Sequence, residues 1–261
     1  MRSFAVVAML LAAARGWSFD HSAFDTLLRR HVVDGMVDYD GFQASADFPR
    51  YLDALGAADP AGLDDTQRLA FWINVYNAYT IQLVNAHGER QSIRNINKTL
   101  GLALKGPWRE KLVRAGGKLL HLDNVEHDII RKQWREPRIH FALVCAAMGC
   151  PPLRSEAYTG AKLEQQLADQ ARKFLLHSPD QNRVDVDSRT AYGSPIYVKY
   201  YREDFGSTDA AIGRYLATFH PDGPEKELLA SGRFKLVATD YDWTLNSQEQ
   251  AAKLVVGPGK P

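Results

Sequence analysis

The longest helical pattern of the chain begins in its first third. Between residues 69 and 84, apolar side chains recur at the three- and four-residue spacing of an α-helix, and apolar residues also fill the other faces. Asp64, followed three residues later by Gln67, has the pattern of a capping box, and Gly88 is expected to end the helix. A helix that is apolar on nearly all sides is normally buried, so we expect this one at the centre of the protein.

Shorter patterns follow along the rest of the chain. Two short runs around Gly116-Gly117 predict a β-hairpin over 111–122, and the β-branched and aromatic run 138–147 predicts a buried strand. Other elements are expected at 24–32, 161–177 and 208–219 (helices) and at 182–187 and 234–243 (strands). Together they predict an α+β domain with a central buried helix, a small mixed or antiparallel sheet and peripheral helices.

A second capping box is expected where a helix follows the hairpin. Asp123 stands before the predicted first turn, and Glu126 occupies the third helical position. The sequence therefore predicts that Asp123 caps this helix and that Glu126 completes the box.

The first residues have the pattern of a secretory signal. Arg2 precedes an apolar run over 4–14, which is shorter than the roughly 20 residues that cross a bilayer. We expect 1–17 to be a signal peptide, 18–250 a single globular domain and 251–261 a flexible tail. The expected location is secreted or periplasmic, with no transmembrane segment in the mature chain, in a compartment where cysteines can pair.

Composition excludes several classes of protein. Lys and Arg number 32 against 31 Asp and Glu, so the charge is balanced and no nucleic-acid partner is expected. Two cysteines exclude a four-cysteine zinc site. The chain has no phosphate-binding loop, no G-x-S-x-G and no H-E-x-x-H, and the spacing of its histidines matches no standard zinc pattern. We expect no metal and no cofactor.

Five segments resemble the domain-of-unknown-function 547 family, and they occur in the family's order. The resemblance extends over about 40–246 and implies a family and a map of segments, without catalytic residues to carry over. The segments are AFWINVYNAYTIQLV (70–84), HLDNVEHDIIR (121–131), RIHFALVCAAMGCPPLRSEAYTGAKLEQQLADQARKFL (138–175), YREDFG (201–206) and YDWTLN (241–246).

The candidate nucleophile is Cys145, at the end of the predicted strand and before a tight loop, where a scaffold can fix an exposed reactive group. A thiol becomes nucleophilic when a base or a positive field forms the thiolate. His140 and His127 are the candidate bases, although His140 and Cys145 would point to opposite faces of a regular strand. Arg131, one turn after His127, could orient it or bind an anionic group.

Structural alternatives remain open for the same residues. Cys145 and Cys150 could form a structural or redox disulfide, or Cys145 could be reduced and inert. Glu126 is a candidate catalytic residue besides its role in the cap. The segments 201–206 and 241–246 are interpreted as packing segments, in which Asp204 or Asp242 could orient a catalytic histidine.

A second group of candidates lies on the central helix. Asn74 and Asn77 are three residues apart and share a face, and a buried amide must find hydrogen-bond partners. They are expected to be buried and bonded to neighbouring backbone. The alternative is a polar binding pocket with Trp72 and Tyr76 as its apolar walls.

Three functions are compatible with these residues. The favoured one is a thiol-dependent hydrolase or acyltransferase that acts on an amide- or peptide-like bond in the cell envelope, by analogy with papain- and transglutaminase-like folds. The alternatives are a non-catalytic binding module with an aromatic, Asn-lined groove and an envelope structural protein. The expected ligand is a small molecule or peptide-like.

Overall fold

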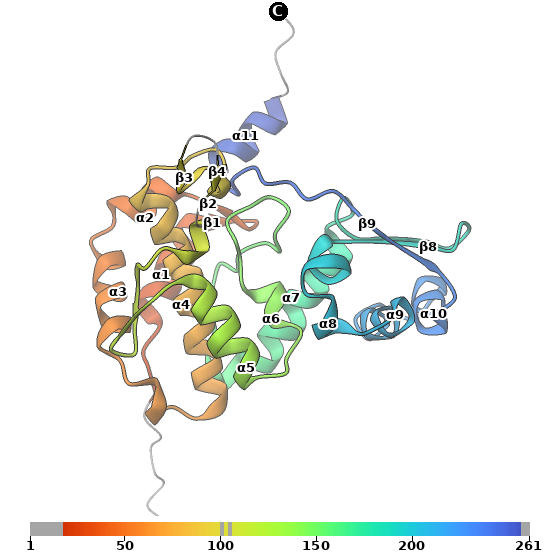
Figure 1. The fold of residues 1–261 in the computed structure, drawn as a ribbon, viewed down its shortest axis with the longest axis horizontal. Helices are drawn as coiled ribbons and strands as arrows, with labels where there is room; N and C mark the ends of the chain where they lie inside the picture. Colours follow the sequence, from red (N-terminus) through yellow and green to blue (C-terminus); the bar gives the residue numbers. More distant parts are fainter. Residues whose placement is uncertain (1–17, 100–101, 104–105, 257–261) are drawn as a thin grey trace, which may run out of the picture.

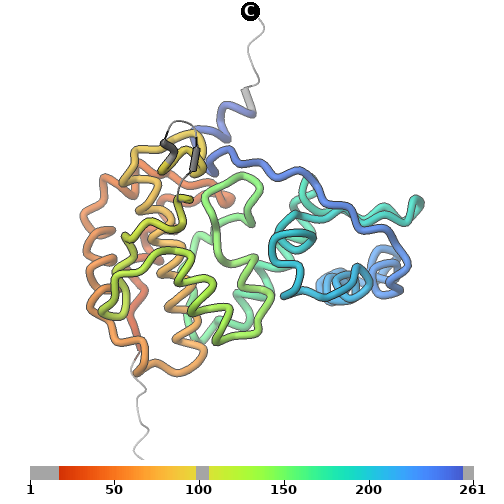
Figure 2. The backbone as a smooth tube through the Cα atoms, in the orientation of Figure 1, coloured from red at the N-terminus to blue at the C-terminus, as the bar shows by residue number. Residues whose placement is uncertain are grey.

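The computed structural model describes residues 18–99, 102–103 and 106–256. The predicted signal peptide, 1–17, lies outside the described residues. Figure 1 shows two groups of elements: α1 to α4 gather on one side, and α8, α9 and α10 lie on the other beside β8 and β9. The chain between β9 and α11 returns from the second group to the first, which Figure 2 shows as a blue tube.

The central helix is α4 (Asp65–Ala86). Asp64 accepts a hydrogen bond from the Gln67 backbone N–H at 2.8 Å, and Gln67 Oε1 accepts one from the Asp64 N–H at 3.4 Å, so the predicted capping box is confirmed. Every side chain from 69 to 81 is buried. Gly88 follows the helix with φ +57°, a left-handed conformation that favours glycine and ends helices.

Helices account for most of the remaining structure. The α-helices are α1 (Ser22–His31), α2 (Tyr39–Ala44), α3 (Asp47–Ala57), α5 (Arg131–Gln133), α6 (Ile139–Ala142), α7 (Leu163–His177), α8 (Arg202–Phe205), α9 (Asp209–Ala217), α10 (Pro224–Ser231) and α11 (Gln248–Val256). Short 3-10 turns are η1 (Pro60–Gly62), η2 (Ile93–Asn95), η3 (Pro107–Arg109) and η5 (Gly160–Lys162), and π-helical segments are η4 (Asn124–Ile130) and η6 (Ile196–Tyr200).

The strands form small sheets, as predicted for the α+β class. Three antiparallel pairs are β1 (Val32–Val33) with β2 (Met36–Val37), β3 (Lys98–Thr99) with β4 (Leu102–Ala103), and β5 (Val113–Ala115) with β6 (Lys118–Leu120). The mixed sheet joins β7 (Arg183–Asp185), β8 (Thr190–Gly193) and β9 (Lys235–Ala238), with β8 and β9 parallel. The hairpin expected over 111–122 is confirmed, and Gly116 and Gly117 both have positive φ at its turn.

Two hydrophobic clusters make up the core. The larger one surrounds α4, and the smaller one lies among α7, η6, α8, α9 and α10. Helix α6 lies between them, because Ile139 and Ala142 belong to the larger cluster and Phe141 to the smaller. The residues around α6 are therefore fixed from both sides.

The prediction of a strand over 138–147 is wrong. Residues Ile139–Ala142 form the helical turn α6, and the chain after it is extended without a neighbouring strand, apart from an isolated bridge between Ala147 and Leu245. The reason is Asn77, whose Nδ2 donates to the Ala142 carbonyl at 2.9 Å and whose Oδ1 accepts from the Val144 N–H at 3.0 Å. The side-chain amide satisfies backbone groups that would otherwise need a strand partner.

The prediction that Asp123 caps the next helix is also wrong. His121 has that role: its Nδ1 accepts from the Asn124 N–H at 3.0 Å, and Asn124 Oδ1 accepts from the His121 N–H at 3.3 Å. Asp123 makes no capping bond and pairs instead with Arg109 at 3.1 Å. The helix starts at Leu122, earlier than predicted. Glu126 therefore lies further along the helix than the third position, and its carboxylate takes no part in the cap.

Part of the expected tail is ordered into a helix. Residues 251–256 belong to α11, and the remainder of 251–261 lies outside the described residues. Within 18–99, 102–103 and 106–256, none of the helices has both the length and the apolar composition required to cross a membrane.

Candidate active site

A cavity of about 280 Å³ opens between the two groups of helices. Its walls come from η4, the chain after α6, η6 and the residues after β9, so segments far apart in sequence meet here. The lining residues are Tyr76, Trp108, Asp123, Glu126, His127, His140, Leu143, Cys145, Cys150, Ile196, Tyr200, Tyr201, Tyr241 and Trp243. This volume and this mixture of aromatic walls with a few polar groups are typical of small-molecule sites.

A wider hollow of about 620 Å³ lies beside α1 and η5, and it is less suited to chemistry. Its polar side chains already have partners: Asp25 accepts from Arg29 at 2.7 Å, and His21 Nδ1 shares a hydrogen bond of 2.7 Å with the Tyr51 hydroxyl. The smaller cavity is therefore the candidate site.

Two π-helical segments contribute to this cavity. Glu126 and His127 lie on η4, and Ile196 and Tyr200 lie on η6. π-helical turns are rare and occur often at functional sites, because they re-aim side chains at a local cost in helix geometry. The candidate site thus coincides with the two irregular helices of the described chain.

His140 is held in a fixed orientation at the cavity wall. Its Nε2 and Asp204 Oδ2 are 2.6 Å apart, and its ring stacks on Tyr201 with centroids 4.0 Å apart. The side chain is only 1% exposed. Since an ionised Asp204 can only accept, Nε2 carries the proton of this hydrogen bond. The Nδ1 atom then lies toward Glu126, whose Oε1 is 3.9 Å away.

Asp204 remains ionised because two donors hold it. The hydrogen bond from His140, followed by those from Arg131 Nε at 2.7 Å and Nη2 at 2.9 Å, lowers the pKa of Asp204 well below its ordinary value, against the opposing effect of burial. An ionised carboxylate at Nε2 fixes the imidazole ring and supports a positive charge on it.

Glu126 is the most deeply buried carboxylate in the cavity, with 5% of its surface exposed. Burial raises the pKa of the Tyr76 and Tyr201 phenols, and the neighbouring Glu126 carboxylate raises both further, so the phenols stay protonated and can donate to it. Among the described residues, no Lys or Arg forms an ion pair with Glu126.

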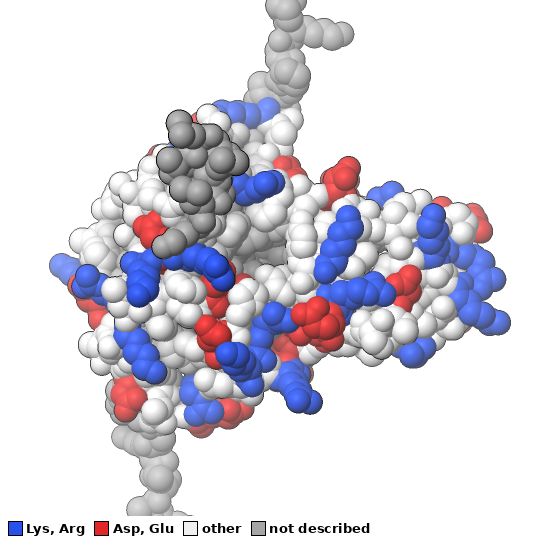
Figure 3. Space-filling view, in the orientation of Figure 1, with Lys and Arg blue, Asp and Glu red and all other residues white. Residues whose placement is uncertain are grey.

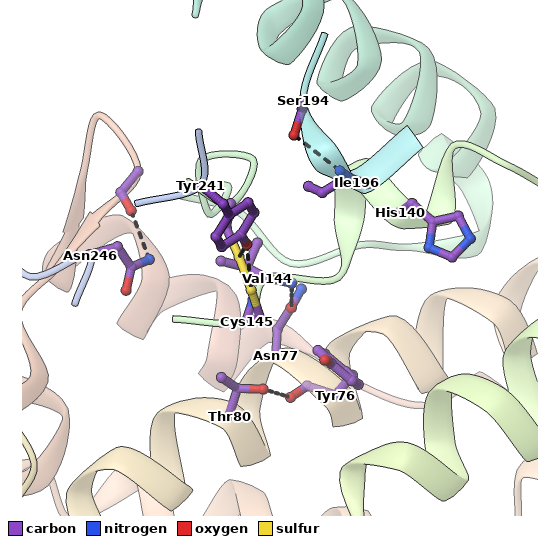
Figure 4. Close-up of a disulfide and its surroundings, with 12 residues drawn as sticks. Tyr76, Asn77, Thr80, His140, Val144, Cys145, Ser194, Ile196, Tyr241 and Asn246 are labelled. Atoms are coloured by element: carbon purple, nitrogen blue, oxygen red, sulfur yellow. Dashed lines mark hydrogen bonds between the residues drawn. A yellow bond between two sulfur atoms is a disulfide. The ribbon is translucent and has the colours of Figure 1, made fainter. Parts of the chain in front are cut away.

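The two cysteines form a disulfide in the wall of the cavity (Figure 4). Their Cα atoms are 6.2 Å apart, and the Tyr241 hydroxyl lies 2.9 Å from Cys145 Sγ and 3.0 Å from Cys150 Sγ. Of the three alternatives for the cysteines, the structure has the disulfide. In this form Cys145 has no thiol, and its polar neighbour is a phenol rather than an imidazole.

The structure brings several of the predicted site residues together. Cys145, His140, His127, Glu126 and Tyr76 all line the cavity. The sequence analysis placed Tyr76 in a separate group of candidates on the central helix. The tertiary structure brings it together with the others, which come from η4, α6 and the chain after α6.

Other predicted residues lie behind the cavity wall. Arg131 binds Asp204 and donates from Nη1 to His127 Nδ1 at 3.1 Å. Asn74 and Asn77 are buried and bonded to backbone, as predicted: Asn74 donates to the Tyr158 carbonyl at 2.7 Å and accepts from its N–H at 3.0 Å. Trp72 packs on Phe71 and reaches the hairpin turn, away from the cavity.

The residues that sequence reasoning missed are mainly aromatic. Trp108, Tyr200, Tyr201, Tyr241 and Trp243 line the cavity, and three of these five, Tyr201, Tyr241 and Trp243, belong to the segments 201–206 and 241–246 that were interpreted as packing. Their aromatic density was the available signal. Of the two aspartates considered there, Asp204 bonds His140, whereas Asp242 accepts from the Thr244 N–H.

No three His, Cys, Asp or Glu side chains within the described part of the chain are arranged to hold a metal ion. The side chains that line the cavity carry imidazole, carboxylate, phenol and, after reduction, thiol groups.

Comparison with known protein families gives one match, which covers part of the chain. Residues 60–175 match the model of the family described as "Protein of unknown function, DUF547". This supports the family that the sequence motifs resemble, over a shorter range than the expected 40–246. The DUF547 segment contains Glu126, His140 and both cysteines, whereas Asp204 and Tyr241 come from the chain beyond it. No curated protein and no solved structure matches the chain.

Proposed function

We propose that the cavity is the active site of a thiol-dependent hydrolase or acyltransferase that acts on an amide- or peptide-like bond. The supporting observation is the His140–Asp204 hydrogen bond of 2.6 Å in the wall of the cavity that also contains Cys145. A nucleophile, a base and a group that orients the base are the three parts of thiol and serine acyl-transfer sites.

Each residue has a role that follows from its surroundings. Asp204 binds Nε2 of His140, so Nδ1 is the nitrogen left to take a proton from Cys145. Asp204 is kept ionised by the hydrogen bonds from His140 and Arg131 and acts as a positioning residue. Glu126 faces Nδ1 from 3.9 Å and stabilises the imidazolium that forms when His140 accepts the proton.

The disulfide is then the oxidised, resting form of the enzyme. A dithiol reductant converts Cys145–Cys150 into two thiols and leaves as its own disulfide, so two electrons and two protons enter the protein. Reduction leaves Cys145 beside the cavity with the Tyr241 hydroxyl next to it.

Acyl transfer follows the established chemistry of thiols. The Cys145 thiolate forms a bond to the substrate carbonyl carbon, the carbon–nitrogen bond breaks, and His140 returns its proton to the leaving amine. Water or a second amine then attacks the thioester, releases the acyl group and restores the thiol.

A pair of single-cysteine variants tests this proposal. Cys150→Ser leaves Cys145 permanently reduced, and Cys145→Ser removes the proposed nucleophile with the same loss of the disulfide. With p-nitrophenyl acetate as acyl donor, Cys150→Ser should release a burst of one p-nitrophenolate per protein without reductant, and acetylated Cys145 should be detected by mass spectrometry. Wild type should show the burst only after dithiothreitol treatment and removal of the reductant.

The matched variant makes the result decisive. Cys145→Ser should give no burst, with or without dithiothreitol treatment. It lacks the disulfide just as Cys150→Ser does, so the two variants differ only in the cysteine that remains. Equal release by both variants, or acetylation of Cys150 or of lysines instead of Cys145, would contradict the proposal.

A non-catalytic binding module is the second candidate, and the disulfide itself favours it, because a bridge in the wall would fix the shape of a binding cavity. In that case the Cys145→Ser/Cys150→Ser double variant should be less stable than wild type, and reduction should produce no acyl-transfer activity.

We also propose that 1–17 is a signal peptide and that the mature chain is secreted or periplasmic. The support is the basic start and the apolar run of 4–14, together with the disulfide, which persists in oxidising compartments. Edman sequencing of the protein recovered from the periplasm or medium should begin near Ser18. An intact Met1 in a cytosolic fraction would contradict this.

A further inference from the structure

The side chains that line the cavity carry an excess of negative charge. Asp123 and Glu126 line it, and no Lys or Arg is among its lining residues within the described chain. Asp123 is paired with Arg109 at 3.1 Å, whereas Glu126 lies 3.9 Å from His140 and beside the Tyr76 and Tyr201 phenols, with no Lys or Arg partner among the described residues. Glu126 is therefore the carboxylate available to an incoming group.

Protonation of His140 does not remove this excess. The connected cluster behind the wall contains three carboxylates, those of Glu126, Asp204 and Glu203. Against them stand one guanidinium, Arg131, and two imidazoles, His140 and His127, of which His127 uses Nδ1 to accept a hydrogen bond from Arg131. Even when His140 is protonated, the net charge of this cluster stays negative. The part of the cavity beside Glu126 therefore attracts a positive group.

Aromatic rings form another part of the cavity wall, which we call the aromatic side. Tyr241 packs against Trp243 with centroids 4.5 Å apart and edge-on against Tyr200 at 5.8 Å, and Trp108 meets Trp243 edge-on at 6.0 Å. The faces of such rings carry negative potential and attract cations. Trp243 already attracts one from outside the cavity, since the Arg94 guanidinium lies 5.1 Å over its ring.

We propose that the group entering this cavity is a cation, an ammonium or guanidinium, which binds between the aromatic side and the Glu126 carboxylate. A buried carboxylate in a cavity lined by aromatic rings favours a cation over a neutral group of the same shape and repels an anion. Resting on the proposed function, the substrate is then an amide- or peptide-like molecule with a positively charged side chain or amine beside the bond.

Two matched probes test the cation preference on the oxidised wild-type protein. Nα-acetyl-lysine methylamide carries the ammonium, and Nα-acetyl-norleucine methylamide lacks it. Binding is followed by the fluorescence of Trp108 and Trp243 and checked by titration calorimetry. The lysine probe should bind at least about tenfold more tightly than the norleucine probe.

Charge variants on one helix separate the cavity carboxylate from the general field of the protein. Glu126→Gln should bring the two affinities within about twofold of each other, because the carboxylate is replaced by a neutral amide of the same shape. Asp128→Asn removes the same charge from the exposed side of η4, where Asp128 pairs with Lys132, and should leave the preference unchanged. Similar preferences in the two variants would overturn the assignment of Glu126.

Tyr200 tests the aromatic contribution, because it lines the cavity and is 50% exposed, so we expect its substitution to disturb the core little. Tyr200→Leu should reduce the preference for the lysine probe, while Tyr200→Phe, which keeps the ring, should retain it. If leucine and phenylalanine behave alike, the ring does not contribute to cation binding and the aromatic part of the proposal fails.

The binding assay is independent of acyl transfer, since it uses the oxidised protein with no free thiol. Equal affinity for the two probes, or binding of neither, overturns the cation site whatever the acylation assay gives. A clear lysine preference without a thiol-dependent burst keeps the cation site and rejects the thiol enzyme.

Discussion

The best-defined energetic prediction concerns Asn77, whose amide takes the place of a strand partner for the chain after α6. Asn77→Leu keeps the branching and the number of side-chain heavy atoms and removes both hydrogen bonds, so the Ala142 carbonyl and the Val144 N–H lose their partner in a buried position. Each unsatisfied buried group costs about 1–3 kcal/mol, which predicts a loss of about 2–6 kcal/mol in the free energy of unfolding.

Thermal unfolding followed by circular dichroism measures this loss. For a domain of this size each kcal/mol lowers Tm by about 2–4 °C, so Asn77→Leu should melt roughly 5–20 °C below wild type. Gln82→Leu is the matched control, because Gln82 is a partly exposed amide on the same helix α4. If Asn77→Leu melted at the same temperature as Gln82→Leu, the amide would not be holding the chain, and the account of why 138–147 is not a strand would be wrong.

Further predictions concern a buried histidine, a helix cap and the orientation of the candidate base. Burial lowers the pKa of His21 to about 4, so between pH 6.5 and 4 the unfolded chain binds a proton that the folded protein does not. The free energy of unfolding, measured by urea denaturation, should therefore fall by up to about 3 kcal/mol as the pH drops through that window. His21→Phe should make the free energy of unfolding less dependent on pH in this window. If the profiles of the variant and wild type coincide there, His21 is not the titrating group. His121→Ala should cost about 0.5–2 kcal/mol through loss of the helix cap, whereas Asp123→Asn, which affects only the Arg109 pair, should cost less than about 1 kcal/mol in the same melts; the reverse order would restore Asp123 as the cap. Asp204→Asn in the reduced protein should slow the alkylation of Cys145 by iodoacetamide at pH 6 and leave the alkylation rate of the unfolded protein unchanged. If the alkylation rate of the native protein is unchanged as well, Asp204 does not affect the reactivity of the thiol.

Local sequence signals predicted the parts of the fold that local physics determines. The capping box at Asp64 and Gln67, the apolar surface of α4 and the Gly116-Gly117 turn each depend on residues a few positions apart. The burial of Asn77 followed from the same pattern, because a polar residue on an apolar helix must be buried with partners.

One error came from a partner that lies far away in the chain, and the other came from a local pattern that fits two starting positions of the helix. The β-branched run 138–147 has the pattern of a strand, but the Asn77 amide, 65 residues before Ala142, forms the hydrogen bonds that a neighbouring strand would otherwise provide. The Asp123 pattern was indistinguishable from a capping box, and the start of the helix at Leu122 decided between Asp123 and His121.

The candidate site was predictable only in part for the same reason. Cys145, His140 and Glu126 were found from residue chemistry within the DUF547 segment, whereas the Asp204 that orients His140 is 64 residues further along. The aromatic wall comes from two segments whose composition fits packing equally well. Positive and negative side chains are mixed on the face shown in Figure 3, as the balanced composition implies. The overall charge of the chain therefore gave no indication of where the cavity lies.

The most direct test of the thiol enzyme is the pH dependence of Cys145 alkylation in the Cys150→Ser variant. An ordinary cysteine has a pKa of about 8.5, and one activated by a neighbouring imidazole has a pKa of about 3.5–7.5. Iodoacetamide labelling of native protein, quantified by mass spectrometry between pH 4 and 10, should show a midpoint well below about 8. A midpoint near or above about 8.5, or labelling only after unfolding, would contradict the proposal that Cys145 is the nucleophile.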